Sequence, residues 1–473
     1  MTRHKYQQEA LPLTDAKTGA LLVISTKSPT SPVFARVSEE RLNSATGEIE
    51  TFTYSHKNKD FVKTRTSEEV RNERFMLQTA SAKLLAYDAK LHATTPHRVV
   101  RCLRSRVKGD KEYIPINSID GKAHYSNLQV CGSVWSCPVC ASKISEHRRK
   151  ELRHVVDTHL AAGGGVVMVT LTFPHYKFDV LADLLQQFKH SLTRYKSGAQ
   201  YAEFKENSEI IGVIRAIEVT HGVNGWHPHA HELVLLPKPL DEIQMCRLHA
   251  DLYKFWSRAC VKSGLPLPSQ QYGVHVQDAT SAADYIAKFG CEPSWEVARE
   301  LVNANTKKSK DQDGATPFDL LRKYNQGDLS AGLLYVEFAN AFFGWRQLFW
   351  SKGLKQLFKL KDLTDDEVVK DEVETIEITR LSIEYWRAIL NCSRDTRAIV
   401  LQIAENGGHD AVQSFVASLP ACPADGLRDM KFKKQPTAKA KKKKVRKTAD
   451  ILAFNSWRFP RFAKNDEMFK KAV

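Results

Sequence analysis

Apolar and β-branched residues gather in four short segments in the middle of the chain. Residues 166–173, 210–220 and 226–236 are runs of the length and composition that are typical of strands. The sequence Gly-Val-Asn-Gly at 222–225 predicts a tight turn between the last two runs. Residues 272–278 alternate apolar and polar side chains, which predicts a fourth strand.

Helical spacing of apolar residues occurs between and after these strands. It predicts helices over residues 181–195, 241–263 and 280–289, and a weaker pattern over 68–91 predicts another. The combination predicts an α+β fold, in which a central antiparallel sheet has helices on one side.

Changes in composition divide the chain into six predicted segments. They are a region of unassigned role (1–95), a Cys-rich zinc-binding segment (96–160), the α+β core (161–295), a helical extension (296–360), a small mixed region (361–425) and a basic flexible tail (426–473).

Charge is concentrated near the end of the sequence. The 473 residues include 70 Lys+Arg and 54 Asp+Glu, a net charge of +16. Eleven Lys or Arg and one acidic residue lie between Arg428 and Lys447. The block Lys441, Lys442, Lys443 and Lys444 predicts a mobile contact with nucleic-acid phosphates, and a solubilising tail is the alternative. No apolar run is long enough to span a membrane, and we expect a cytoplasmic protein.

Four of the nine cysteines form a zinc-like pattern. The spacing Cys131-x5-Cys137-x2-Cys140 supplies three sulfurs, and an odd cysteine count argues against a disulfide framework. Cys102 is the first candidate for the fourth ligand, with His147 or His154 as alternatives. A redox pair would not require Cys131. We therefore expect structural Zn²⁺.

A basic segment follows this cysteine cluster. Arg148, Arg149 and Lys150 lie on a predicted helix and are candidate DNA contacts, while a solvated helix face is an equal alternative.

The sequence His227-Pro-His229-Ala-His231 occupies the third predicted strand. Residues two apart in a strand face the same side, so His229 and His231 can direct both imidazoles at one divalent metal ion. Glu218, on the preceding strand of the same hairpin, is the natural third ligand. The shifted pair His227 and His229 is left open.

The predicted helix at 280–289 carries Tyr285 and Lys288 on one face. A tyrosine hydroxyl can attack a phosphodiester when a metal ion and a nearby ammonium stabilise the developing charge. An ordinary amphipathic helix with a buried tyrosine is the alternative, and the histidine strand favours the catalytic interpretation.

The order of three motifs resembles the HUH (His-hydrophobe-His) endonuclease superfamily, and within it the plasmid rolling-circle replication initiators with a single catalytic tyrosine. The resemblance covers roughly residues 98–355. It rests on residues 169–173, 226–236 and 285–289, with support from 131–140, 316–321 and 344–350.

This resemblance implies a ferredoxin-like core and strand-specific nicking at a plasmid or phage origin. It implies that His229 and His231 bind Mn²⁺ or Mg²⁺, that Tyr285 is the nucleophile and that Lys288 stabilises it. The products would be a 5′-phosphotyrosine and a free 3′-hydroxyl primer. Without a phosphate-binding loop of its own, the chain would depend on a host helicase and polymerase. The oligomeric state is left open.

The sequence departs from the family pattern at Ser281, where relatives often have a glutamate that activates water for termination. Asp278, Asp284 and Glu218 are the candidate substitutes. A transposase or relaxase of the same superfamily is one alternative function. A non-catalytic, zinc-dependent DNA-binding regulator is another.

Overall fold

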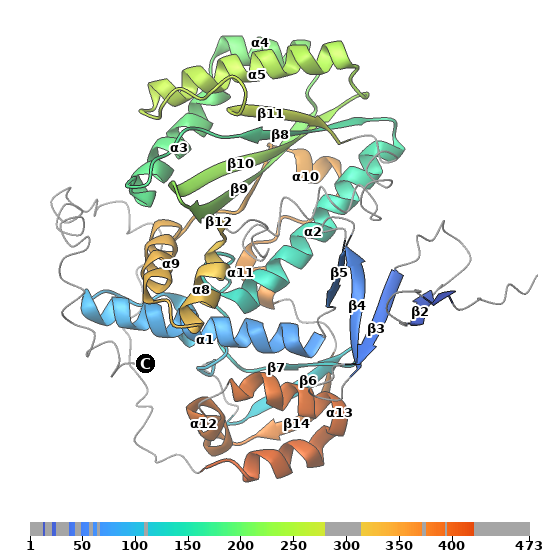
Figure 1. Cartoon of the computed structure of the whole chain (residues 1–473), viewed down its shortest axis with the longest axis vertical. Helices are drawn as coiled ribbons and strands as arrows, with labels where there is room; N and C mark the ends of the chain where they lie inside the picture. Colours follow the sequence, from blue (N-terminus) through green and yellow to red (C-terminus); the bar gives the residue numbers. More distant parts are fainter. Residues whose placement is uncertain are drawn as a thin grey trace, which may run out of the picture. The chain divides into compact units, whose positions relative to one another are not determined.

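Six antiparallel strands form the central sheet. In this computed structural model the described residues are 67–107, 112–279, 314–370, 375–392 and 395–420, with the backbone of five short strands before residue 67. All of these described residues belong to one compact unit, residues 1–421. The strand order is β11-β8-β10-β9-β12, and β13 also pairs with β9 (Figure 1). These strands are β8 (Gly165–Leu171), β9 (Gly212–Gly222), β10 (Gly225–Leu236), β11 (Val274–Asp278), β12 (Gly314–Ala315) and β13 (Leu348–Trp350).

Helices cover both faces of this sheet. Helices α3 (Leu181–Tyr195) and α5 (Glu242–Lys262) pack on one face, where Phe188 belongs to the same apolar cluster as Val169 and Ala230. Helices α2 (Pro138–Ala161) and α10 (Leu354–Leu357) pack on the other (Figure 1). The prediction of helices on one side was therefore wrong, because alternate strand positions such as Val166 and Leu233 are apolar too and need their own cover.

The second face changes from apolar to polar along its strands. Val166 and Leu233 lie on this face far from the β9–β10 turn. The residues on the same face nearer the turn are polar: Thr170, Glu218, His229 and His231. This polar end carries all the predicted metal ligands of the hairpin.

The turn between β9 and β10 is closed by a glycine. Gly225 has φ = +82°, and a Cβ there would lie 2.9 Å from the carbonyl oxygen of Tyr176. Both the left-handed backbone and the close approach require glycine. The turn fixes a register in which His229 lies opposite Glu218 and His231 lies between Ala216 and Thr170.

The remaining described elements are a second sheet, an N-terminal meander and further helices. A second sheet has the order β14 (Ile376–Leu381), β6 (Ile114–Ile119), β7 (Lys122–Tyr125). The N-terminal meander comprises β1 (Leu13–Thr14), β2 (Leu21–Ile24), β3 (Val37–Leu42), β4 (Ile49–Ser55) and β5 (Asp60–Lys63). The other helices are α1 (Ser67–Leu91), η1 (Arg98–Arg101), α4 (Ala199–Asn207), α8 (Pro317–Asn325), α9 (Leu329–Ala341), α11 (Asp365–Lys370), α12 (Ile383–Asn391) and α13 (Thr396–Ala417). Among the described helices, none is both long and apolar enough to cross a membrane.

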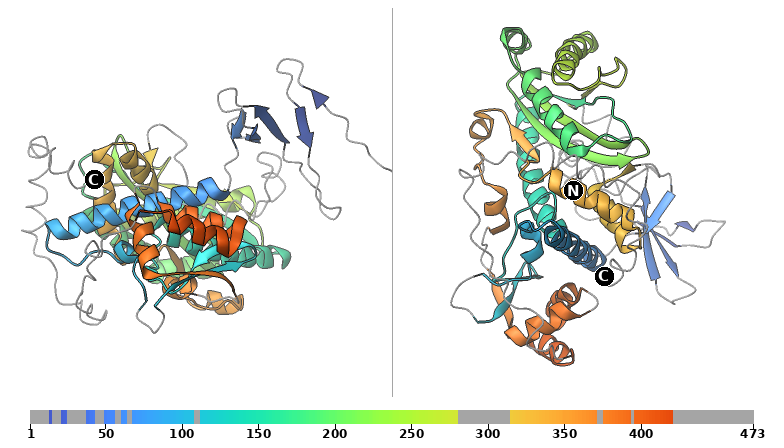
Figure 2. Two further views of the ribbon diagram at one scale, coloured as in Figure 1. Left: turned by 90° about the horizontal axis from the view of Figure 1, so that it is seen from below. Right: turned by 90° about the vertical axis from the view of Figure 1, so that its left-hand side faces the viewer.

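Helices α1 and α13 run side by side although they are far apart in sequence (Figure 2). Arg397 of α13 is 1% exposed, and its guanidinium forms an ion pair with Asp395 at 2.7 Å. The same group donates to Gln78 Oε1 at 2.8 Å and to the carbonyl of Leu103 at 3.0 Å. Gln78 in turn donates through Nε2 to the carbonyl of Cys102. Arg397 thus links α13 to the cysteine segment through α1.

Four buried cysteines converge at the start of α2. The Sγ–Sγ distances are 3.5 Å between Cys102 and Cys140, 3.6 Å between Cys131 and Cys140, and 3.7 Å between Cys137 and Cys102. A tetrahedral zinc site with Zn–S bonds of about 2.3 Å requires Sγ–Sγ separations of about 3.8 Å. The spacing suggests zinc, and it is far too long for disulfides.

The electrostatics of the cluster favour a thiolate at one of its members, Cys137. Cys137 is the N-cap of α2 and accepts from the backbone N–H of Cys140 at 3.5 Å. Burial raises the pKa of Cys137, but hydrogen bonds from the other three thiols and this N–H outweigh burial and hold it well below its ordinary value. Of the three candidates for the fourth ligand, Cys102 is the one in the cluster. His147 instead contacts Glu151, and His154 contacts the carbonyl of Phe358.

Loss of one cysteine of the cluster should release zinc. We expect the purified protein to contain about one zinc per chain. Cys102→Ser should reduce the zinc content to well below half of that value. It should also lower the free energy of unfolding, since structural zinc contributes directly to folding. Mass-spectrometric metal analysis and urea denaturation measure both. The control is Cys246→Ser, which changes an exposed cysteine outside the cluster and should leave both unchanged. Full zinc content in Cys102→Ser would contradict the assignment.

Candidate metal centre

Glu218, His229 and His231 bring three potential ligand atoms together. These atoms all lie within 4.8 Å of one another. Oε2 of Glu218 lies 3.4 Å from Nε2 of His229 and 3.8 Å from Nε2 of His231. Adjacent central strands supply all three residues, so the register of one hairpin creates the arrangement.

The Nδ1 atoms of both histidines have partners within the sheet. Nδ1 of His229 lies 3.2 Å from the carbonyl oxygen of His227, and Nδ1 of His231 lies 3.0 Å from Oγ1 of Thr170. A carbonyl oxygen only accepts, so neutral His229 carries its proton on Nδ1 and directs the lone pair of Nε2 at the carboxylate. Two electron-rich atoms facing each other at this distance fit a cation between them, and hydrogen bonds to the far nitrogen are typical of metal-binding histidines.

The donor set determines which ions the group could hold. Two imidazole nitrogens and one carboxylate oxygen suit a divalent ion of intermediate softness and leave coordination positions for other ligands. Glu218 and His231 are each 8% exposed, and a low-dielectric surrounding strengthens their attraction for a cation. The Glu218-His229-His231 group could therefore hold a metal ion.

His227 occupies a different position from its two neighbours. Its ring stacks on His229 at a centroid distance of 4.9 Å and on His175 at 4.6 Å. Burial, followed by the charges of His229, His175 and His231, lowers the pKa of His227 to about 3, so the ring is neutral near pH 7. In this arrangement His229 and His231, and not His227 and His229, share Glu218.

Sequence reasoning missed two residues around this group. Thr170 lies opposite His231 on β8, and His175 extends the imidazole stack from the loop after β8. Thr170 already lay in a predicted strand, but only the pairing of β8 with β10 reveals which residue it orients. No local pattern distinguishes His175 from other loop histidines.

Several predicted residues lie outside the described part of the chain. Tyr285, Lys288, Ser281, Asp284 and the block Lys441–Lys444 are among them. Asp278 is described, and it is an exposed residue at the end of β11, where it pairs with Val167. It alternates with Val274 and Val276, which pack toward α5, so it lies on the face opposite Glu218.

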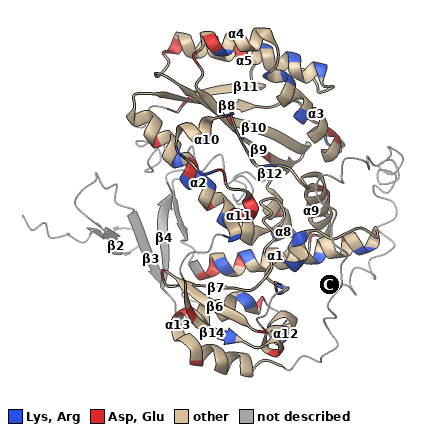
Figure 3. Cartoon of the chain, turned by 180° about the vertical axis from the view of Figure 1, so that it is seen from behind, with Lys and Arg blue, Asp and Glu red and all other residues tan. Residues whose placement is uncertain are grey.

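Two of the three candidate DNA contacts on α2, Arg148 and Arg149, form ion pairs within the protein. Arg148 is 8% exposed and its guanidinium pairs with Glu151 at 2.9 Å and Asp365 at 3.1 Å. Arg149 forms an ion pair with Glu146, and Lys150 is exposed. Basic and acidic residues are interspersed along α2 (Figure 3). Arg148 thus joins α2 to the start of α11.

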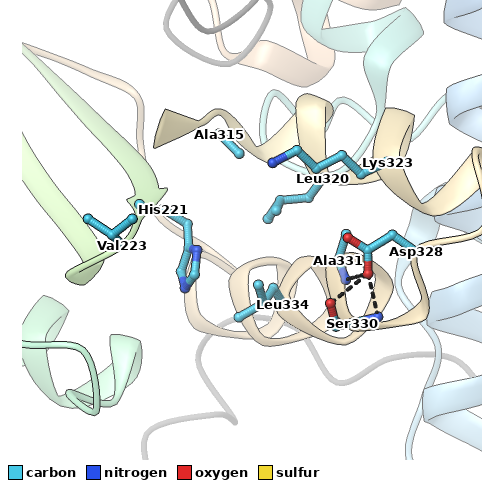
Figure 4. A pocket seen from close by; sticks show the side chains of 10 residues that line it. His221, Val223, Ala315, Leu320, Lys323, Asp328, Ser330, Ala331 and Leu334 are labelled. Carbon is cyan, nitrogen blue, oxygen red and sulfur yellow. Dashed lines mark hydrogen bonds between the residues drawn. The ribbon is translucent and has the colours of Figure 1, made fainter. Parts of the chain in front are cut away.

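A separate pocket lies beyond the metal-binding group, at the turn end of β9. It has a volume of ≈ 250 Å³, and His221 and Lys323 lie on opposite sides of it (Figure 4). Burial lowers the pKa of His221, and the nearby charge of Lys323 lowers it further. His221 follows Glu218 by three residues on one strand, a separation of about 10 Å. The pocket is thus distinct from the metal-binding group.

Comparison with known proteins gives a family match and similarity to two curated proteins. The family described as "Replication protein" matches residues 123–392. A curated relative named "Protein rep" from Streptomyces lividans is 27% identical over 300 residues, covering 49% of this chain and 64% of the relative. A protein named "Neomycin resistance protein" from Streptomyces cyanogenus is 33% identical over 141 residues, covering 24% of this chain and 32% of that protein.

The matches with the two relatives cover part of each protein, whereas the family match covers more than half of this chain. The chain spans less than two thirds of the length of either relative. No solved structure matches the chain. The family match, however, extends over more than half of the sequence and includes Cys131, Cys137, Cys140 and the whole metal-binding group. The chain therefore belongs to the Replication protein family.

Proposed function

We propose that this chain initiates rolling-circle replication of a plasmid or phage by nicking one strand of origin DNA. Members of the family are generally nicking enzymes, and the name of the Streptomyces lividans relative is consistent with replication. The observation that carries the proposal is the convergence of His229, His231 and Glu218 on one point, with the far nitrogens of both histidines anchored.

The metal-binding group would hold Mn²⁺ or Mg²⁺. Such an ion supplies charge stabilisation and polarises the scissile phosphate. Two nitrogen ligands are softer than Mg²⁺ usually takes, so Mn²⁺ should bind more tightly. The chain's own contribution is to orient both imidazoles, through the carbonyl of His227 and the hydroxyl of Thr170.

Tyr285 is the proposed nucleophile, and the position of Ala279 supports this. The N–H of Ala279 donates to the carbonyl of Val166 at 2.8 Å, and its side chain packs in the apolar cluster on the histidine face. The Val166 and Thr170 positions of β8 are four residues apart, about 13 Å. Six residues from Ala279 to Tyr285 can extend about 20 Å. Tyr285 is therefore within reach of His231.

The proposed step exchanges one phosphodiester for another. The Tyr285 oxygen bonds to phosphorus, the bond from phosphorus to the 3′ oxygen breaks, and the 3′ oxygen takes up a proton. Lys288 stabilises the charge on the phosphate. The 3′-hydroxyl primes synthesis by a host polymerase behind a host helicase, and later attack by a new 3′-hydroxyl on the phosphotyrosine restores Tyr285. Lys441, Lys442, Lys443 and Lys444 add sequence-independent phosphate contacts.

Removal of the tyrosine oxygen should abolish the covalent step. The substrates are single-stranded oligonucleotides that tile the replicon encoding the chain, incubated with the full-length protein and Mn²⁺. A 3′-labelled strand should become attached to the protein in a denaturing gel, and a 5′-labelled strand should yield a shorter product that a polymerase extends. Tyr285→Phe should abolish both, whereas Tyr385→Phe, on α12 and outside the site, should retain them. An adduct with Tyr285→Phe would refute the assignment, and binding without cleavage by the unaltered chain would favour a regulator.

Thr170 should control metal affinity and not the chemistry. In Thr170→Val the Nδ1 atom of His231 loses its partner, so the Mn²⁺ concentration for half-maximal nicking should rise about 10- to 100-fold. The maximal rate at saturating Mn²⁺ should change little. Thr220→Val, opposite His227 on the same face, is the control and should change neither value. An unchanged Mn²⁺ requirement in Thr170→Val would show that this hydroxyl does not orient a ligand.

A further inference from the structure

Three exposed aromatic side chains lie in two neighbouring loops at the turn end of the sheet. Tyr176 is 60% exposed, Phe178 74% and Tyr272 69%. We call these three residues the aromatic rim. Exposing rings of this size to water is unfavourable unless a partner covers them. Among the described residues, the other exposed aromatic side chains are Phe343 and Phe349, which lie in later segments.

The loop that carries two of these rings has a defined conformation. The N–H of Tyr176 donates to the Asp179 carboxylate at 2.7 Å, and the N–H of Asp179 donates back to the carbonyl of Tyr176 at 3.0 Å. This closes a four-residue turn that presents Lys177 and Phe178 at its tip. Gly225 of the β9–β10 turn packs against the backbone of Tyr176 and Lys177. Phe178 is thus exposed on a supported turn.

Direct contacts connect the aromatic rim to the metal-binding group. His175, the residue before Tyr176, stacks on His227, and His227 stacks on His229. Thr172 donates through Oγ1 to the carbonyl of Tyr272 at 2.7 Å and through its N–H to the carbonyl of Gly273 at 2.9 Å. Thr172 follows Thr170, the partner of His231, by two residues. Both loops therefore border the polar end of the sheet.

We propose that the aromatic rim stacks on unpaired bases of single-stranded DNA beside the scissile phosphate. This inference rests on the proposed function, which brings a single strand to this end of the sheet. Separate rings on loop tips suit successive bases, whose faces are accessible only when the strand is unpaired. Lys177 is exposed beside Phe178, with its ammonium 5.9 Å from the ring centroid, and it can contact the adjoining phosphate. A polyanion with flat apolar bases complements both groups better than an apolar peptide does.

The test measures base stacking without nicking. The probe is an oligothymidylate of about 16 nucleotides with one central 2-aminopurine and a terminal fluorescein. It is mixed with the full-length protein without added Mn²⁺. Stacking on an aromatic ring quenches 2-aminopurine, and fluorescein anisotropy gives the affinity. Phe178→Ala should weaken binding about 5- to 150-fold, the range measured for loss of one stacked base. The quenching should fall, and the slope of log K against log salt should stay constant.

Two controls separate this role from others. Lys177→Ala should reduce the salt slope by about 0.7, the value for one phosphate contact on a single strand. Phe343→Ala removes another exposed ring, 53% exposed on a different element, and should leave affinity and quenching unchanged. Circular dichroism verifies that each variant is folded.

The possible outcomes distinguish the two proposals. Unchanged affinity and quenching in Phe178→Ala would overturn the aromatic rim as a DNA contact, even if Tyr285 forms an adduct. Equal weakening for the oligothymidylate annealed to its complement would also overturn it, because paired bases cannot stack on a ring. A dimer that Phe178→Ala dissociates would assign the surface to a second copy of the chain. If Phe178→Ala behaves as expected but no adduct forms at Tyr285, the rim stands and the nicking proposal fails.

Discussion

The pairing of β9 with β10 is the constraint on which the candidate site depends. Each face of this hairpin carries a cross-strand pair that includes a carboxylate, Glu218 with His229 on one face and Arg215 with Glu232 on the other. Glu232 is 1% exposed and forms ion pairs with Arg215 at 2.6 Å and Lys196 at 2.9 Å. Burial raises the pKa of Glu232, but Lys196 and Arg215 outweigh burial and hold it below its ordinary value.

The Arg215–Glu232 pair makes any shift in the register of β9 against β10 unfavourable in free energy. A shift by one residue would turn Glu232 toward the metal-binding side and His231 into the apolar layer beneath α3 and α5. An unpaired buried carboxylate costs several kcal/mol, roughly 3–5 when one partner of a buried ion pair is lost. The buried ion pairs of Glu232 therefore select the register that directs both histidines at Glu218, although none of their atoms touches the metal-binding group.

Helix α2 runs from the cysteine cluster to the histidine face of the sheet. Its first turn holds Cys140, and its later residues Leu152 and Val155 pack under the histidine face of the sheet. A helix of 24 residues is about 36 Å long, so a tetrahedral zinc centre at its start would fix the position of its far end. Between these points, Glu151 pairs with Arg148 and with Lys355 of α10. The basic residues of α2 thus contribute to joining the cysteine cluster to the sheet.

The sequence could predict contacts that depend on strand alternation and short spacing. The hairpin pattern predicted Glu218 beside His229, and the cysteine spacing predicted three of the four sulfurs. It could not predict that β13 completes the sheet beside β9, or that β14 pairs with β6 far earlier in the chain. Such pairings depend on distant segments meeting. For the same reason a run of arginines did not reveal that Asp365 neutralises Arg148.

The candidate metal ligands and the proposed nucleophile come from different parts of the chain. One hairpin supplies Glu218, His229 and His231, and their far-side partners come from the same sheet. Tyr285 follows β11, an edge strand, and the next described strand of the sheet, β12, lies at the other edge. The metal-binding group can thus form without the tyrosine. An ion held by a preformed group would fix the phosphate first, and Tyr285 would then meet an electrophile already in place, which separates binding of the strand from its cleavage.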